Sequence, residues 1–439
     1  MQFHVTANHR RHSRCLIDPW RYNEKLLKNA HTGIAVNPHL DKLHPYPFEK
    51  LRQLFAGVTP NADYAPISLG IGEPKHPTPA FIEKALMHAV AGLSSYPSTI
   101  GAEPLRTAIA GWLERRYGLP PIDAATMVLP VNGSREALFA IAQCCVDGSK
   151  PGALVMCPNP FYQIYEGAAY LAGAAPYFVN SNPARNFAPD YGNVPDEVWS
   201  RVQLLYVCSP GNPTGAVLTL DDWRELFALA DRYGFLIAAD ECYSEIYTGA
   251  TPPLGALEAA HALGRSSADQ PYRNLIVFSS LSKRSNVPGM RSGFVAGDPV
   301  AMKRFLLYRT YSGGAMSPPV QSASIAAWND EQHVIENRAL YKEKFNLITP
   351  LLKEVMDVEL PDAGFYLWAD VRRTKLTDTY FARRLYLDYN VTVLPGSYLA
   401  RDAHGQNPGQ GRIRMALVAG VDEGLEAANR IVQFCKSLA

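Results

Sequence analysis

Short apolar runs alternate with helical patterns along most of this chain. The runs are ALVMCP, VQLLYVCSP, FLIAADE, LIVFSS and GFVAGD, which begin at residues 153, 202, 235, 275 and 293. Runs this short, flanked by turn residues, are typical of strands buried on both faces of a mostly parallel sheet. Helical patterns such as REALFAIAQCCV lie between strands and supply the crossover connections. We therefore predict an α/β fold with helices flanking the sheet.

Composition excludes several classes of partner. The 439 residues are 47% apolar and 19% charged, enough for a substantial core, and the net charge of +1 gives no field that would attract nucleic acid or an anionic membrane. The seven cysteines show no CxxC spacing, so we expect reduced thiols in a cytoplasmic protein and no metal site. No apolar stretch reaches the ~18 residues of a membrane helix. A small-molecule partner is expected.

The pattern of apolar, charged and turn residues changes along the sequence and divides the chain into three parts. Residues 1–36 include the basic run HRRHSR and have no apolar core, so we predict a disordered or loosely docked extension. Residues 71–317 contain the alternating pattern and form the predicted large domain. Residues 37–70 and 318–439 are predicted to form a smaller α+β domain, with FYLWADV, VTVLPG and RIRMALVA as strands.

Polar residues follow several of the predicted strands. Lys283 comes just after LIVFSS, Asp240 ends FLIAAD, and Asn212 lies in SPGNPTG directly after another apolar run. Parallel sheets carry their sites at the carboxyl ends of strands. A carboxylate buried there needs a cation or donors, and a buried amine there has the lowered pKa that Schiff-base formation requires. Each residue also has a plainer explanation, such as a surface lysine or a proline-rich turn.

These residues together indicate a single ligand. Lys283 suits an aldehyde, Asp240 a cationic ring nitrogen and Asn212 a ring oxygen. Donors suited to a phosphate occur at a predicted helix start and beyond Lys283, namely Gly133, Ser134, Arg135, Ser280 and Arg291. Ser134 alone has the simpler explanation of a helix N-cap. Pyridoxal phosphate has all of these groups, so the joint pattern predicts this cofactor.

The order of these motifs resembles the class I/II aminotransferases of pyridoxal-phosphate fold type I, from about Asn37 to the C-terminus. The resemblance implies a large domain with a mostly parallel seven-stranded sheet, a smaller α+β domain, and a homodimer with shared active sites. Longer stretches, including ADECYSEIY, FSSLSKRSNVPGMRSGFVAGD and PDAGFYLW, resemble the succinyldiaminopimelate branch of that family. That branch implies amino transfer from glutamate to N-succinyl-2-amino-6-oxopimelate in lysine biosynthesis.

The resemblance also implies roles for residues around the cofactor ring. Lys283 would bond covalently to the cofactor aldehyde, and Asp240 would keep the ring nitrogen protonated. Asn212 and Tyr243 would hydrogen-bond the ring hydroxyl oxygen. Tyr162, in PNPFYQIY, would stack on the ring, and Phe161 is the neighbour that takes this role if the register differs by one.

Phosphate and substrate contacts follow from the same resemblance. Tyr96 would reach across a dimer interface to the partner subunit's phosphate, with an ordinary turn aromatic as the alternative. Arg414 would bind the substrate α-carboxylate, and Gly72 would face the substrate. Arg412 lies two residues from Arg414, on the same face of a strand, so alternation alone leaves both candidates open. The phosphate contacts would come from the backbone of Gly133, Ser134 and Arg135 and from Ser280 and Arg291.

Fold and cofactor leave the exact reaction open. An aminotransferase for aspartate, an aromatic amino acid or LL-diaminopimelate is the nearest alternative, and a β-eliminating C–S lyase is a further one. A transcription regulator on this fold would need a DNA-binding module, for which residues 1–36 are too short. Candidates for reading the succinyl group are polar residues near or after the cofactor segment, Arg284, Asn286 and Arg309.

Overall fold

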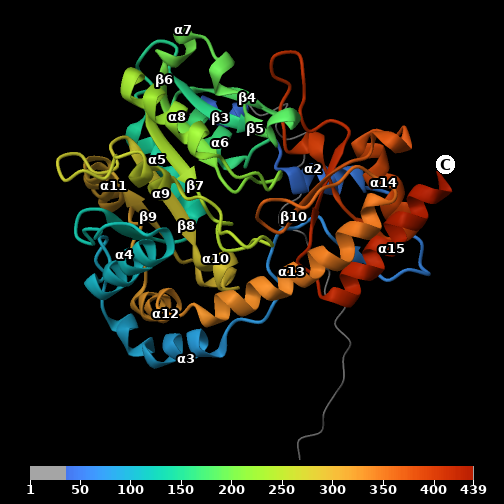
Figure 1. Cartoon of the computed structure of the whole chain (residues 1–439), viewed down its shortest axis with the longest axis horizontal. Coiled ribbons are helices and arrows are strands. Elements are labelled where there is room, and N and C mark those ends of the chain that lie inside the picture. The colour runs from blue at the N-terminus through green and yellow to red at the C-terminus, as the bar shows by residue number, and fades with distance from the viewer. Residues whose placement is uncertain (1–35, 439) are drawn as a thin grey trace, which may run out of the picture.

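A large sheet forms the centre of the molecule (Figure 1). Within residues 36–438, which the computed structural model describes, it has eight strands. The extension predicted for residues 1–36 therefore lies outside the described residues except for its last residue. In spatial order the strands are β2 (Val128–Val131), β9 (Gly293–Gly297), β8 (Leu275–Ser280), β7 (Leu236–Asp240), β6 (Val202–Cys208), β3 (Leu154–Asn159), β4 (Ala175–Asn182) and β5 (Ala188–Pro189).

Strand directions agree with the predicted mostly parallel sheet. β8, β7, β6, β3 and β4 run parallel, while β9 is antiparallel to both of its neighbours, β8 and β2. The α/β fold is thus confirmed. The strand number differs from the expected seven because β5, only two residues long, pairs antiparallel with the end of β4.

Helices cover both faces of this sheet. Leu154 and Met156 of β3 pack into the core on one face, and Val155 and Cys157 pack into the core on the other, because successive side chains of a strand point to opposite sides. One face is covered by α4 (Glu103–Tyr117), α8 (Leu220–Tyr233), α9 (Ala256–Ala262) and α12 (Pro318–Trp328), and the other by α5 (Ser134–Cys145), α6 (Ile164–Leu171) and α11 (Pro299–Ser312).

The smaller lobe combines segments from both ends of the described chain. Strand β1 (Ile67–Ser68) pairs in parallel with β11 (Val391–Thr392). An antiparallel sheet of β10 (Tyr366–Asp370), β13 (Arg412–Ala416) and β12 (Leu394–Pro395) lies beside them. The helices of this lobe are α2 (Pro47–Leu54), α13 (Gln332–Lys353), α14 (Asp378–Tyr389) and α15 (Val421–Ser437), and α13 runs along α15 (Figure 1).

Helix α12 packs against the larger lobe, whereas the predicted domain division assigns it to the smaller one. It begins at the predicted boundary, residue 318, yet Ala323, Ala327 and Trp328 belong to the core of the larger lobe. It packs against α4 and α3 (Ala80–His88), which lie in that lobe. Packing therefore favours a boundary between α12 and α13.

Two shorter helices complete the larger lobe, α7 (Asp196–Trp199) and α10 (Leu281–Arg284). Helix α10 starts directly after β8, at the carboxyl edge of the sheet where β7 also ends with Asp240. No helix among residues 36–438 has the length and apolar content needed to cross a bilayer.

Candidate active site

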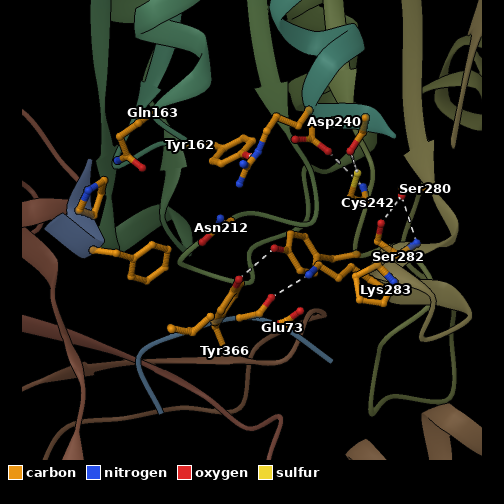
Figure 2. A pocket seen from close by; sticks show the side chains of 18 of the residues that line it. Glu73, Tyr162, Gln163, Asn212, Asp240, Cys242, Ser280, Ser282, Lys283 and Tyr366 are labelled. Atoms are coloured by element: carbon orange, nitrogen blue, oxygen red, sulfur yellow. Dashed lines mark hydrogen bonds between the residues drawn. The ribbon is translucent and has the colours of Figure 1, made fainter. Parts of the chain in front are cut away.

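A cavity of about 530 Å³ opens at the carboxyl ends of the central strands, where the two lobes meet (Figure 2). The larger lobe contributes the ends of β7 and β8, and the smaller lobe contributes Tyr366 from β10 and Arg414 from β13. All of the residues predicted for the site line this cavity except Gly133 and Tyr96; those that line it are Gly72, Ser134, Arg135, Tyr162, Asn212, Asp240, Tyr243, Ser280, Lys283, Arg291 and Arg414.

Lys283 points into the cavity from the first turn after β8. Its Nζ donates a hydrogen bond to the carbonyl oxygen of Gly72 at 2.7 Å. The pKa of Lys283 is lowered from 10.5 to about 8, mainly by burial and to a smaller extent by the nearby guanidinium of Arg414, while Glu73 opposes the change. An amine with this pKa is unprotonated in part near neutral pH, as attack on a carbonyl carbon requires.

Asp240 ends β7 with its carboxylate almost fully buried, at 5% exposure. Tyr165 donates its hydroxyl to Oδ2 at 2.8 Å, and the Cys242 backbone N–H donates to Oδ1 at 3.2 Å. Burial raises the pKa of Asp240, and these hydrogen bonds oppose the rise. A cationic ring nitrogen in the cavity would supply the positive partner that a buried carboxylate needs.

Tyr165 is a site residue that the sequence analysis missed. Its ring stacks on Tyr206 with centroids 4.4 Å apart, which fixes the hydroxyl toward Asp240. The available signal was its position three residues after Tyr162, but only the fold brings it to the end of β7.

An anion seat forms where helix α5 begins. Gly133 occupies the N-cap position with φ of 86°, and no side chain in the described part of the protein caps the helix, so its first N–H groups remain available to an anion. A Cβ on Gly133 would lie 2.1 Å from a guanidinium nitrogen of Arg291, so a side chain there would displace this cation. Free N–H groups beside a guanidinium suit a phosphate dianion.

Two serines line the cavity beside this seat. The Ser280 hydroxyl donates to the Ser292 carbonyl oxygen at 3.0 Å and accepts from the Ser282 N–H at 3.1 Å. Ser280 therefore caps the short helix that carries Lys283. Ser282, which the sequence analysis did not select, also lines the cavity (Figure 2).

Arg414 has the environment of an anion-binding residue. It is 3% exposed; Nη1 donates to the Asn212 Oδ1 at 3.0 Å and Nη2 donates to the Gly70 carbonyl oxygen at 2.8 Å. Its buried Nε has no hydrogen-bond partner among residues 36–438. Arg412, the alternative, lies 3.5 Å from Asp370 and does not line the cavity. The structure thus separates two arginines that strand alternation could not.

The structure also distinguishes the two aromatic residues that were candidates for stacking on the cofactor ring. Tyr162 lines the cavity, and its hydroxyl accepts a hydrogen bond from Arg135 Nε at 2.6 Å. Phe161, the alternative stacking residue, is buried in the core beside Phe178. Tyr243 also lines the cavity, with its hydroxyl 3.0 Å from that of Tyr366, which is labelled in Figure 2.

Other sequence candidates lie outside this cavity. Arg284 is buried against Trp328 and pairs with Glu331, and Arg309 pairs with Glu136, so neither faces a substrate here. Asn286 is also buried and does not line the cavity. Tyr96 is fully exposed, and its contact with a partner subunit's phosphate stays a prediction. Gly133 is not a lining residue, but it lies in close contact with the guanidinium of Arg291, which lines the cavity.

The donor set fits one cofactor. A buried amine, a buried carboxylate, an uncapped helix start beside an arginine and an unpartnered guanidinium nitrogen suit the aldehyde, ring nitrogen and phosphate of pyridoxal phosphate and a substrate carboxylate. A doubly covered sheet with a smaller lobe closing over its edge is the framework of the fold-type I pyridoxal-phosphate enzymes.

Comparison with known proteins narrows this class. The family model for aminotransferase class I and II matches residues 65–428, and the chain belongs to that family of pyridoxal-phosphate enzymes. A crystal structure of an aminotransferase from Neisseria meningitidis is 52% identical, with a TM-score of 0.87 over 91% of this chain and 100% of that chain.

Two further relatives carry more specific names. LL-diaminopimelate aminotransferase from Dehalococcoides mccartyi is 32% identical over 90% of this chain and 97% of its own length. A structure named as a probable N-succinyldiaminopimelate aminotransferase, from Thermus thermophilus, is 26% identical with a TM-score of 0.75, over 88% of this chain and 97% of that chain.

Proposed function

We propose that the protein is a succinyldiaminopimelate aminotransferase. It would transfer the amino group of glutamate to N-succinyl-2-amino-6-oxopimelate, giving N-succinyl-LL-2,6-diaminopimelate and 2-oxoglutarate. The observation that carries this proposal is the charge of the cavity. Its described lining has the cations Arg135, Lys283, Arg291 and Arg414 but only the acids Glu73 and Asp240. Succinylation replaces the distal ammonium of the substrate with a further carboxylate, which suits an excess of positive charge.

Arg135 is the cation left for the distal end of the substrate. Arg291 lies at the phosphate seat and Arg414 at the proposed α-carboxylate position, whereas the Arg135 guanidinium reaches the Tyr162 hydroxyl on the cavity wall. The wall continues with apolar side chains that can accept the methylene chain of a long substrate, namely Tyr46, Phe48, Ile71 and Leu399.

The protein groups divide the work of amino transfer. Pyridoxal phosphate, when bound, supplies an electron sink for the charge that develops at the substrate Cα. Asp240 holds the charge of the ring nitrogen, and Arg414 binds the α-carboxylate through parallel N–H donors. The Lys283 Nζ, with its lowered pKa, moves the Cα proton. Asn212 and Tyr243, which line the cavity, would hydrogen-bond the ring hydroxyl oxygen.

A second candidate substrate is LL-diaminopimelate. The 32% identity to enzymes of that name supports it, and Glu73 on the cavity wall could accept a hydrogen bond from a distal ammonium. The two substrates differ at the distal end alone, so Arg135 and Glu73 make a matched pair for distinguishing them.

The test is a comparison of amino donors with 2-oxoglutarate as acceptor. We expect kcat/KM for N-succinyl-LL-2,6-diaminopimelate to exceed that for LL-diaminopimelate, acetylornithine and aspartate. Arg135→Gln should lower the preference for the succinylated donor by about tenfold, the effect of one lost charge-assisted contact. Glu73→Gln should leave that preference unchanged. A higher kcat/KM for LL-diaminopimelate would replace the proposal with the second candidate. Release of a thiol, pyruvate and ammonia from an added cysteine S-conjugate, without 2-oxoglutarate, would instead indicate a C–S lyase.

We infer that the enzyme works as a homodimer with shared sites. Tyr96 is fully exposed, and Met87, Val90 and Leu93 expose apolar surface in the segment before it. In a dimer the Tyr96 hydroxyl would reach the phosphate seat of the partner subunit. Sedimentation of the holoenzyme tests the dimer, and a purely monomeric holoenzyme that turns over substrate would contradict it.

A further inference from the structure

A short segment of backbone, residues 70–76, follows β1 and lines the cavity through Ile71, Gly72 and Glu73; we call it the strap. Three cations contact it. Arg414 Nη2 donates to the Gly70 carbonyl oxygen at 2.8 Å, and Lys283 Nζ donates to the Gly72 carbonyl oxygen at 2.7 Å. At its far end, Lys344 Nζ lies 2.7 Å from Nε2 of His76.

Two of these three contacts involve groups that the reaction needs elsewhere. In the proposed function, which this inference rests on, Lys283 bonds to the cofactor and Arg414 turns its donors toward a carboxylate. Both contacts with the strap are then given up or shared during each turnover. The contact between Lys344 and His76 is not used by the chemistry, so it can persist throughout.

The Lys344 side chain is buried, and contacts with other segments fix its position. Its side chain, on α13, is 2% exposed. Its N–H groups are directed at His76 Nε2 and at the carbonyl oxygens of Leu417 and Val418, at 3.2 and 3.4 Å, just after the strand that carries Arg414. Three acceptors match the three donors of an ammonium. Lys344 thus ties the strap to the strand of the carboxylate-binding arginine.

The hydrogen bonds fix the protonation state of His76. Burial lowers the pKa of Lys344 to about 8, so near pH 6.5 its amine is still an ammonium, which only donates. Nε2 of His76 must then accept, and the ring proton resides on Nδ1. Nδ1 then donates to the Asn337 Oδ1 at 2.7 Å. Asn337 Nδ2 in turn donates to the Lys283 carbonyl oxygen at 3.4 Å. The network therefore continues from the strap to the turn that carries the cofactor lysine, and it requires a neutral imidazole.

The charges around His76 favour the same state. Burial lowers the pKa of His76, the hydrogen bond with Asn337 opposes this, and the charge of Lys344 lowers it further. Tyr341, on α13, packs with its ring centroid 4.7 Å from that of His76. The remaining charged groups nearby are Lys75 on the strap, which pairs with Glu423 of α15 at 3.6 Å, and Glu343 on α13. A proton on Nε2 would face the Lys344 ammonium across 2.7 Å and break the contact.

We propose that His76 and Lys344 are positioning residues that anchor the strap over the active site while Lys283 and Arg414 release it during turnover. Because Gly72 of the strap faces the substrate, loss of the anchor should weaken substrate binding more than the chemical step. The anchor holds only while His76 is neutral, so acid should release the strap.

The test compares two substitutions of His76 in the holoenzyme. His76→Gln keeps an acceptor toward Lys344 and a donor toward Asn337 but cannot be protonated. His76→Leu removes both. We expect the leucine variant to raise KM for the amino donor by about tenfold with a smaller change in kcat, as for loss of a charge-assisted hydrogen bond. We expect wild-type kcat/KM to fall in acid, below pH 6.5, as His76 is protonated. The glutamine variant should stay within about threefold of wild type near neutral pH and should lack this fall.

Two controls make the result specific. Lys342→Gln changes an exposed lysine on the same helix as Lys344, outside the strap, and should leave KM and the pH profile unchanged. Imidazole NMR of the apoprotein should show the His76 signal, assigned by its loss in His76→Gln, as the neutral Nδ1–H form at pH 6.5. An unchanged KM in the leucine variant, the same acid limb in the glutamine variant, or a protonated His76 signal would overturn the proposal. A wild type without aminotransferase activity on any donor would instead overturn the proposed function.

Discussion

At the residue scale, Arg414 and Arg412 differ in the residues that contact each guanidinium. Arg414→Lys should raise KM for both the amino donor and the oxo acid at least about tenfold, because an ammonium cannot supply two parallel donors to a carboxylate. Arg412→Lys is the matched control, since that arginine lies beside Asp370 outside the cavity, and its steady-state constants should stay near wild type. Steady-state kinetics of both variants measure the effect. Greater damage from Arg412→Lys would move the carboxylate site to that residue.

The sequence pattern predicted which kinds of residue form the site, but it could not always decide which of two nearby residues of the same kind lies in the cavity. Arg412 and Arg414 share a strand face, so only their partners, Asp370 on one hand and Asn212 on the other, distinguish them. Contacts between distant segments left no local signal. Lys344 and His76 are 268 residues apart, and nothing in either neighbourhood predicts that they meet.

At the element scale, the start of helix α5 forms the phosphate seat. Gly133→Ala should weaken cofactor binding at least about tenfold, because the new Cβ would lie 2.1 Å from an Arg291 nitrogen at a backbone φ of 86°. Gly118→Ala is the matched control. Gly118 follows the last residue of α4 at φ 61°, and no atom lies within 4 Å of the position of a Cβ there. An alanine at this position would therefore bear backbone strain of about 1 kcal/mol without contacting the phosphate seat.

Equilibrium titration of the apoprotein with pyridoxal phosphate measures this difference. Both alanine variants should lose some stability to heat, but only Gly133→Ala should lose cofactor affinity. Equal cofactor affinity in the two variants would show that the seat does not depend on the approach of Arg291 to this glycine.

Elements of the larger lobe were predictable because apolar runs bounded by turns mark buried strands. Strand direction was less predictable, because the run that forms β9 has the same pattern as the runs of the parallel strands but pairs antiparallel with both of its neighbours. The two-residue β5 is too short to leave a pattern. Helix α12 follows a change in sequence texture, yet tertiary packing of Trp328 places it with the larger lobe.

At the scale of the whole molecule, a buried acid next to the site should make stability depend on pH. Glu241 accepts hydrogen bonds from the Tyr117 hydroxyl and the Ala256 N–H at 2.9 and 2.6 Å, and burial raises its pKa from 4.5 to about 7. The folded protein therefore keeps a proton that the unfolded chain loses above pH 4.5. The free energy of unfolding should fall by about 3 kcal/mol between pH 4.5 and 7 from this group and then level off.

Glu241→Gln removes this titration while keeping the acceptor for Ala256. Urea unfolding of the apoprotein should show the variant gaining on wild type as pH rises from about 5 to 7. Glu359→Gln, at a side chain 83% exposed, is the control and should follow wild type at every pH. A constant difference between Glu241→Gln and wild type across this range would contradict the assignment.

The parallel pairing of β1 with β11 has a consequence for how the chain folds during its synthesis. Ile67 leaves the ribosome 324 residues before its partner Val391, which at about 5 to 20 residues per second is a delay on the order of 15 to 65 s. The larger lobe can bury its sheet in that interval, but the strap, which directly follows β1, has no strand to anchor it. The nascent enzyme thus presents Lys283 in an open groove, and the mouth of the cavity closes only near the end of translation.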